Sequence, residues 1–219
     1  MTLAQPAPVP VSPGPIPWKQ GEHMAIIGDT GSGKTFLEAR LIAMRDYAVV
    51  CRTKPDDIKF PGFKTVRSAS AMDSLDEHRL LLTPKYERQA VEIAEALTKA
   101  WEQGHWTIAI DELYYATTML KLEPYVNRLL TQGRSKRITV ITGMQRPAWI
   151  SRFALSQSTH TFLFVTEGRD TKTIAQALSP RLADVVSELR KHEFAYFHRP
   201  SRTIRRGYAQ NLQELITKA

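Results

Sequence analysis

Short apolar runs bounded by polar residues recur along the chain, and we predict that they form buried strands. They lie at 24–27, 47–51, 80–82, 107–110, 137–142 and 161–165. Between them, apolar residues repeated at intervals of three and four predict helices at 36–44, 87–103 and 124–132. Strands that alternate with helices in this way predict an α/β fold built on a mostly parallel central sheet.

The C-terminal part of the chain predicts smaller elements. Two short helices are predicted at 171–178 and 181–191. The runs 194–198 and 204–208 flank a polar turn, which predicts a β-hairpin, and a short helix is predicted after it. The interval 58–76 shows no clear period, so we assign it as loop with room for one short strand.

Proline marks the N-terminal boundary of the folded part. Six of the 13 prolines lie within the first 17 residues, among small side chains. Such a segment lacks core-forming side chains, so residues 1–17 are predicted to be a flexible, polyproline-like arm. Residues 18–219 are enough for one well-filled α/β domain, and Trp18 is predicted to mark its start.

The strand predicted at 24–27 leads into a glycine-rich segment that opens the helix predicted at 36–44. Its residues are Gly28, Asp29, Thr30, Gly31, Ser32, Gly33, Lys34 and Thr35. Glycines allow a tight turn whose N–H groups face phosphate oxygens, and the helix N-terminus adds a positive dipole. Lys34 would reach the β- and γ-phosphates of ATP, and the Thr35 hydroxyl would bind Mg²⁺. An ordinary glycine-rich turn would leave Lys34 and Thr35 unexplained.

The apolar run 107–110 ends in two adjacent acids, Asp111 and Glu112. In nucleotide hydrolases of this type, the first acid holds Mg²⁺ and the second polarises the attacking water. The alternative is that these acids only end a strand before a helix cap. Their position downstream of a phosphate loop favours the catalytic interpretation.

The charge balance favours a polyanionic partner. The formal net charge is +8 and the sequence pI is about 9.7, which suits nucleic acid, although a basic soluble protein is the simpler alternative. No acid lies between Glu123 and Glu167, whereas six basic residues do: Arg128, Arg134, Lys136, Arg137, Arg146 and Arg152. We expect this tract to face phosphate, either of DNA or of a neighbour's nucleotide, rather than solvent alone.

Cysteine content and hydropathy exclude several classes of protein. The only cysteine, Cys51, rules out an internal disulfide and a cysteine-built metal site, and its apolar surroundings predict a buried thiol. No apolar run approaches the length of about 18 residues that spans a bilayer, and no signal peptide precedes the first strand. We therefore expect a cytoplasmic protein without a transmembrane segment; a viral one would lie in the host cytoplasm or be associated with the virion.

Other phosphate-loop classes fit the sequence less well. A GTPase would carry Asn-Lys-x-Asp, which is absent, and a nucleotide kinase would lack the acid pair at the strand end. The acid pair favours the division in which a further strand lies between the phosphate-loop strand and the acid strand. We predict that 137–142 is this inserted strand and that it delivers Gln145 near the γ-phosphate.

At this point the motifs resemble those of the FtsK/HerA superfamily of DNA-pumping ATPases. The stretch from His23 to Thr35 is similar to the superfamily's first motif, and the strand that ends in Asp111 and Glu112 is similar to its second. The segment 142–147, Thr-Gly-Met-Gln-Arg-Pro, resembles its Thr-Gln-Arg-Pro sensor, with Met144 in place of the threonine. The resemblance covers roughly residues 23–165.

The resemblance implies a three-layer αβα P-loop NTPase with the ASCE strand order, which hydrolyses ATP with Mg²⁺ and moves double-stranded DNA without reading its sequence. It implies catalytic roles for Lys34, Glu112 and Gln145. It also implies a homo-oligomeric ring in which Arg134, or Arg146 as second choice, acts on a neighbour's γ-phosphate. Because a membrane-spanning N-terminus and a DNA-reading winged helix are both missing, the chain is most similar to genome-packaging ATPases of tailless, membrane-containing viruses. A capsid or vertex protein is then an expected partner.

Two other functions remain open from the sequence. One is a cellular or plasmid motor of the same superfamily, which would move DNA in division or conjugation. The other is a nucleotide-dependent scaffold that binds ATP and moves nothing. Glu112 speaks against the scaffold, because a protein that only binds ATP needs no water-activating acid.

Overall fold

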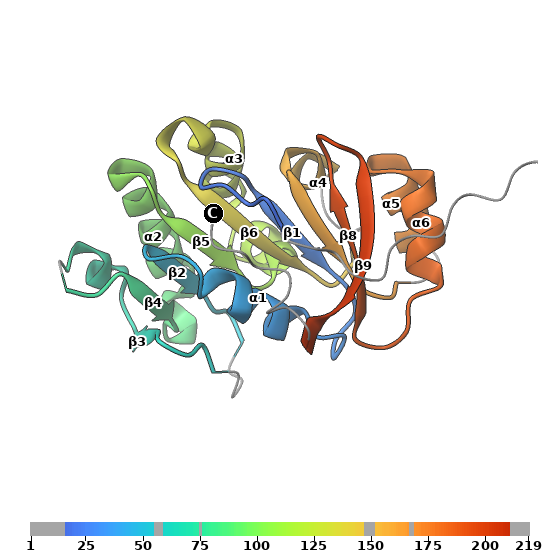
Figure 1. Ribbon diagram of the computed structural model, residues 1–219. Coiled ribbons are helices and arrows are strands. Elements are labelled where there is room, and N and C mark those ends of the chain that lie inside the picture. The colour runs from blue at the N-terminus through green and yellow to red at the C-terminus, as the bar shows by residue number, and fades with distance from the viewer. Residues whose placement is uncertain (1–15, 55–58, 75, 147–151, 167–168, 211–219) are drawn as a thin grey trace, which may run out of the picture.

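A computed structural model describes residues 16–54, 59–74, 76–146, 152–166 and 169–210. Within these ranges one sheet contains nine strands in the order β3-β4-β2-β5-β6-β1-β7-β8-β9 (Figure 1). The strands are β1 (Met24–Ile27), β2 (Ala48–Cys51), β3 (Lys64–Val66), β4 (Arg79–Leu82), β5 (Thr107–Ile110), β6 (Thr139–Met144), β7 (His160–Leu163), β8 (Glu193–His198) and β9 (Thr203–Tyr208). The first seven strands in this order, including β1 and β2, pair in parallel, and β8 and β9 add an antiparallel hairpin at one edge.

Helices lie on both faces of this sheet. They are α1 (Lys34–Ile42), α2 (Gln89–Gln103), α3 (Glu123–Gln132), α4 (Arg152–Gln157), α5 (Arg169–Ala177) and α6 (Pro180–Ser187). Short turns of other helix types occur at η1 (Ala69–Asp73), η2 (Tyr86–Arg88), η3 (Tyr115–Met119) and η4 (Gly133–Lys136). No helix in the described ranges has the length and apolar character needed to cross a membrane.

Two hydrophobic clusters show why the fold has three layers. One cluster packs side chains of α2 to α6 on one face of the sheet, and the other packs α1 with Trp18 on the opposite face. Figure 1 shows α1 on the opposite side of the sheet from α2 and α3. The strands β1, β2 and β5 are buried along their whole length, because both of their faces are covered. Continuous apolar runs, rather than alternating ones, are what such covered parallel strands require.

Most of the predicted elements are confirmed, with boundaries shifted by a few residues. The inserted strand is β6, which lies between β5 and β1 as predicted, but it begins at Thr139 and continues to Met144. Arg137 precedes it with a left-handed backbone (φ 55°), which is why the strand starts later than its apolar pattern suggests. The predicted C-terminal hairpin is confirmed as β8 and β9. Trp18 is buried, as is Ile16 just before it.

Some elements were not predicted, and some predictions are not covered by the structure. Strand β3 is the one short strand for which the interval 58–76 left room, whereas α4 and the π-type turn η3 were not expected. Residues 1–15 of the predicted arm and the predicted C-terminal helix at 211–219 lie outside the described residues, as does Pro147 of the sensor motif.

Candidate active site

The phosphate loop joins the carboxyl end of β1 to the first turn of α1. The N–H of Gly28 donates to the carbonyl oxygen of Met144 at 3.1 Å, which ties the loop to the end of β6. A Cβ on Gly28 would lie 2.6 Å from Cβ of Phe164, so only glycine fits there. Gly33 caps α1 with a left-handed backbone (φ 109°), and the first turn carries no acid. A helix N-terminus without nearby carboxylates favours bound anions.

Lys34 folds back over this loop. Its Nζ donates to the carbonyl oxygens of Gly28 at 2.6 Å and Asp29 at 2.7 Å. Burial lowers the pKa of the Lys34 ammonium, and the nearby Glu112 carboxylate partly opposes that shift. The ammonium is therefore fixed beside the loop amides, where a triphosphate would meet both.

The two acids follow β5 at the same edge of the sheet. Asp111 forms an ion pair of 3.0 Å with Arg52, and both side chains are buried. Glu112 is 3.5 Å from Nζ of Lys54, which is half exposed. Burial raises the pKa of Glu112, while the cations of Lys54 and Lys34 oppose the rise. A carboxylate with a raised pKa is a stronger base, which suits the activation of water.

Gln145 follows β6 directly and is half buried. Strand β6 pairs in parallel with β5 on one side and with β1 on the other. The acids after β5, Gln145 after β6 and Gly28 after β1 therefore lie side by side at the carboxyl ends of the three strands. A Cβ on Gly143 would lie 2.2 Å from the carbonyl oxygen of Asp111, so β6 approaches β5 too closely for any side chain there. The structure thus brings the predicted phosphate loop, acids and sensor together.

Magnesium fits the residues at this edge. Thr35, in the first turn of α1, is half buried, and Asp111 offers a carboxylate. The described ranges contain no cluster of three or more His, Cys, Asp or Glu that could hold a metal ion. One hydroxyl and one carboxylate suit Mg²⁺, which proteins usually bind through one or two oxygen ligands together with the phosphates of a nucleotide.

Arg134 lies away from this constellation. It sits in η4, before β6, and its carbonyl oxygen would be 3.4 Å from a Cβ placed on Gly21, which precedes β1. Its side chain is exposed at the amino ends of the strands, on the opposite edge from the phosphate loop. Arg146, the second choice, follows Gln145 and therefore lies at the edge that carries the acids.

Three residues near the site were not predicted from the sequence: Arg52, Lys54 and His192. Arg52 and Lys54 follow β2, and the general rule that parallel strands present functional residues at their carboxyl ends could have found them. His192 Nδ1 lies 3.2 Å from the carbonyl oxygen of Ser32, so the turn before β8 touches the phosphate loop. Between them is a cavity of about 290 Å³ that Val165 and Leu189 also line.

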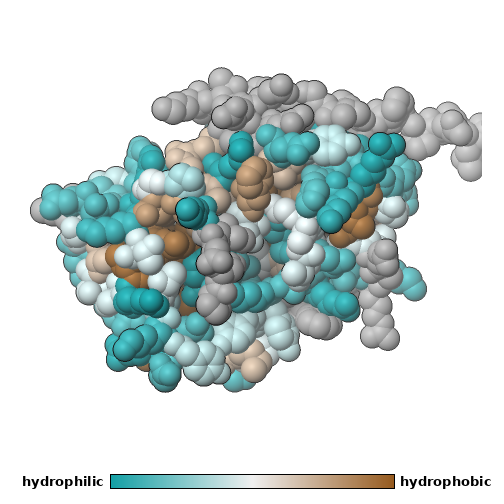
Figure 2. Space-filling view, turned by 90° about the horizontal axis from the view of Figure 1, so that it is seen from below, coloured by the Kyte–Doolittle hydropathy of each residue, from teal (hydrophilic) through white to brown (hydrophobic). Residues whose placement is uncertain are grey.

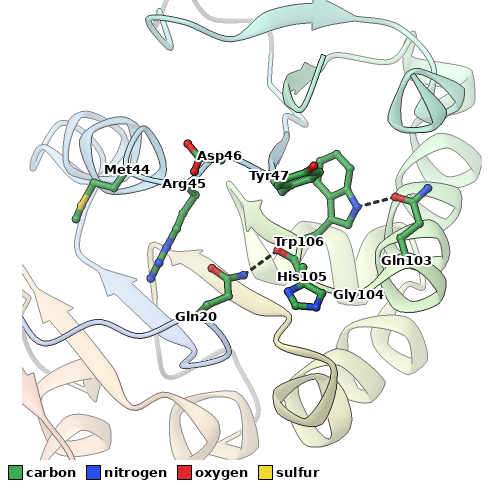
Figure 3. A pocket seen from close by; sticks show the side chains of 9 residues that line it. All are labelled: Gln20, Met44, Arg45, Asp46, Tyr47, Gln103, Gly104, His105 and Trp106. Atoms are coloured by element: carbon green, nitrogen blue, oxygen red, sulfur yellow. Dashed lines mark hydrogen bonds between the residues drawn. The ribbon is translucent and has the colours of Figure 1, made fainter. Parts of the chain in front are cut away.

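A larger cavity, of about 520 Å³, lies at the amino ends of the central strands, opposite the phosphate loop (Figure 3). Trp106 and Tyr47 meet edge to face at 5.7 Å between ring centroids, and the Trp106 indole donates to Gln103 at 2.6 Å. Gln20 donates to the carbonyl oxygen of His105 at 3.0 Å. The cavity has no contact with the acids or the phosphate loop, so its size does not make it the catalytic centre.

Comparisons with known proteins agree with this geometry. No family model matches the chain. It is 27% identical over 162 residues to the DNA packaging ATPase P9 of Enterobacteria phage PRD1, covering 70% of this chain and 68% of that protein.

Solved structures share the fold. The genome packaging NTPase B204 of Sulfolobus turreted icosahedral virus 2, in complex with ATP-gammaS, has a TM-score of 0.71 at 17% identity, covering 86% of this chain and 98% of that one. The pCW3 conjugation coupling protein TcpA with ATPgS has a TM-score of 0.54 at 16% identity, covering 90% and 62%. The chain is therefore an α/β protein with the P-loop NTPase fold of these solved structures, and its sequence is similar to that of a phage DNA packaging ATPase.

Proposed function

We propose that this protein is a genome-packaging ATPase that hydrolyses ATP to move double-stranded DNA. One observation carries the proposal: the phosphate loop, the acid pair and the glutamine follow the carboxyl ends of three neighbouring strands. These strands are β1, β5 and β6, and β6 lies between the other two. An acid pair at this position serves hydrolysis, whereas a protein that only binds nucleotide has no use for it.

The residues divide the reaction among them. The amides of the phosphate loop and the Lys34 ammonium bind the triphosphate and stabilise its charge. Thr35 and Asp111 would hold Mg²⁺, which would neutralise part of the charge of the nucleotide phosphates. Glu112 accepts a proton from the attacking water, and Gln145 contacts the γ-phosphate. Water then displaces ADP from the γ-phosphorus, and the products are ADP and inorganic phosphate.

The base of the nucleotide fits the cavity beside the loop. That cavity is lined by Val165, Leu189, Lys191 and His192 on the side away from the loop. Apolar side chains offer contact to a planar base, and the histidine ring can stack on it.

The finer parts of the proposal concern the assembly. A homo-oligomeric ring brings an arginine of one subunit to the γ-phosphate of the next, and Arg134 is our choice for it. A net charge of +8 supports sequence-independent binding to the phosphate backbone of DNA. A capsid or vertex protein is the expected docking partner, because packaging requires a portal into the particle.

Steady-state ATP hydrolysis, measured with and without duplex DNA, tests the proposal. We expect hydrolysis that DNA stimulates, and we expect Lys34→Ala to abolish nucleotide binding because it removes the charge beside the phosphates. DNA binding should weaken steeply with salt and should not depend on sequence. Nucleotide binding without hydrolysis would instead indicate the scaffold, and a strong preference for one DNA sequence would count against a motor.

A further inference from the structure

A third cavity lies beside Arg52 and Lys54, the cations that pair with the acids after β5. It measures about 440 Å³ and opens at the carboxyl ends of β2 and β4. Four of its lining residues are basic and none is acidic; the basic ones are Arg52, Lys54, Arg67 and Lys85. A concave site lined by one sign of charge concentrates ions of the other sign, so this cavity selects anions.

The basic side chains are held in different ways. Nη1 of Arg67 donates to the carbonyl oxygen of Thr83 at 2.8 Å, which fixes the guanidinium at the cavity. Lys85 is exposed, and the neighbouring Tyr86 is 76% exposed. The rim therefore presents a cation and a tyrosine to solvent, which suits a ligand larger than the cavity itself.

Thr53 adds a polar group that the fold does not satisfy. The residue is only 8% exposed, and among the described residues its Oγ1 has no hydrogen-bond partner. Its carbonyl oxygen accepts from Nε2 of Gln89 at 3.0 Å, so the backbone of Thr53 is fixed. A buried hydroxyl without a partner costs stability, which is unusual unless a ligand uses the group.

The cavity shares its wall with the active site. Arg52 and Lys54 line it and also pair with Asp111 and Glu112. The contact between Lys54 and Glu112 is long, at 3.5 Å, and the Lys54 side chain is 50% exposed. Because the contact is long and the lysine end is half exposed, Lys54 can turn from Glu112 towards an anion in the cavity.

We propose that this cavity binds a backbone phosphate of the DNA and that the bound phosphate draws Lys54 away from Glu112. The inference rests on the proposed function. Bound DNA then frees the water-activating carboxylate, so hydrolysis rises when the motor holds its cargo. The nucleotide of the same subunit is a poorer candidate ligand, because its phosphates lie at β1, beyond β5 and β6 from the cavity.

Figure 2 shows that hydrophilic side chains predominate on the face seen from below, with only separate hydrophobic patches.

Two substitutions in the full-length protein test the site. Lys85→Ala removes a rim cation, and Thr53→Val removes the buried hydroxyl while keeping the shape of the side chain. The readout is fluorescence anisotropy of a labelled duplex of arbitrary sequence, measured at several salt concentrations. We expect each variant to bind the duplex about three- to tenfold more weakly. Lys85→Ala should also reduce the slope of log K against log salt by about 0.9, whereas Thr53→Val should leave the slope unchanged.

Thermal unfolding separates this role from a structural one. Thr53→Val should be as stable as the wild type or more stable, because it removes a polar group buried without a partner. Lys172→Ala serves as the matched control, because Lys172 is an exposed lysine on α5, close in sequence to neither the cavity nor the loop. It should bind the duplex like the wild type.

The outcomes distinguish the inference from the function on which it rests. Wild-type DNA affinity in both folded variants overturns the cavity assignment, while DNA-stimulated hydrolysis by the wild type would still support the motor. Weaker binding of a fluorescent ATP analogue, with unchanged DNA affinity, assigns the cavity to nucleotide and also overturns the inference. A wild-type protein that binds no duplex at any salt concentration overturns the motor itself.

Discussion

The guanidinium of Arg52 lies 3.0 Å from the carboxylate of Asp111, with only 3% and 9% of the two side chains exposed. Arg52 comes from the end of β2 and Asp111 from the end of β5, so the pair joins two neighbouring strands. Both charges pay for leaving water, and each relies on the other for compensation. The acid proposed to hold Mg²⁺ is thus positioned by a cation that lies outside the sequence motifs.

Arg52→Met should destabilise the protein by about 3–5 kcal/mol, because it leaves the Asp111 carboxylate buried without its cation. The double variant Arg52→Met with Asp111→Asn removes both charges and should recover most of that loss. Urea unfolding of the two variants and the wild type measures the effect. A cost below about 1 kcal/mol for the single change would show that the pair behaves like an exposed one.

Glu112→Gln should bind ATP and lose about 10²- to 10⁴-fold in hydrolysis, because the amide cannot accept a proton from water. Burial raises the pKa of Glu112, so the folded state disfavours the ionised form. The wild type therefore loses stability as pH rises through that raised pKa, and Glu112→Gln does not. At neutral pH the variant should be the more stable protein, with a gap that closes on acidification. Wild-type hydrolysis by this variant would remove Glu112 from the mechanism.

His23 should make the folded state sensitive to acid. Its Nδ1 accepts the Val140 N–H at 3.1 Å, and burial lowers the pKa of His23 to about 4. The folded state thus resists protonation that the unfolded chain accepts near pH 6.5, so stability is present above that pH and falls between about 6.5 and 4. The shift corresponds to about 3 kcal/mol.

Urea unfolding across this pH range should show a shallower fall for His23→Asn than for the wild type. The fall should not vanish, because burial also lowers the pKa of His160. His105→Asn is the control, since His105 is exposed and Asn tolerates its positive φ of 62°. An identical pH profile for His23→Asn and the wild type would contradict the assignment.

Gly143→Ala should disrupt the site, because the new Cβ would lie 2.2 Å from the backbone oxygen of Asp111. Backbone on a central strand cannot yield as a flexible side chain can, so we expect a loss above about 4 kcal/mol or a displaced Asp111 without hydrolysis. Gly62→Ala is the matched control: its nearest atom is Nη1 of Arg79 at 3.8 Å, and its φ of 79° costs about 1–2 kcal/mol. Urea unfolding and steady-state ATPase rates are measured for both variants. Equal stability of Gly143→Ala and Gly62→Ala would refute the predicted clash.

Local patterns were enough to predict the central strands and the position of the glycine-rich loop. The runs that became β1 and β5 are continuous and apolar, and the glycine spacing after β1 has few structural alternatives. The placement of β6 between them followed from the acid pair, and the close approach at Gly143 explains the glycine before Met144.

Contacts between distant segments were beyond the sequence pattern. Arg52 and Lys54 belong to the site only because β2 lies next to β5, a pairing of residues more than 50 positions apart. The short strand allowed for in 58–76 could not be placed from the sequence, because the three residues of β3 are largely exposed and carry no apolar run. η3 was missed because π-type turns have no reliable sequence signal.

The last prediction concerns Arg134, whose exposed side chain lies before β6, while the phosphate loop lies at the other end of the sheet. β6 spans six residues, which corresponds to about 20 Å at ~3.3 Å per residue. Arg134 therefore cannot reach the γ-phosphate of its own subunit. A role in catalysis requires a neighbouring subunit whose phosphate loop meets this edge, and a monomer should then hydrolyse ATP poorly.

Arg134→Ala should keep ATP binding and lose hydrolysis by about 10³-fold or more, as expected for an arginine finger. Mixing this variant with Glu112→Gln gives the decisive measurement. In mixed rings, some interfaces pair an intact Glu112 with an intact Arg134 from the neighbour, so part of the ATPase activity should return. Mixed assemblies without recovered activity would exclude Arg134 as the finger. The same experiment with Arg146→Ala would follow, because Arg146 lies at the edge that carries the acids and could reach a neighbour only through a different ring interface.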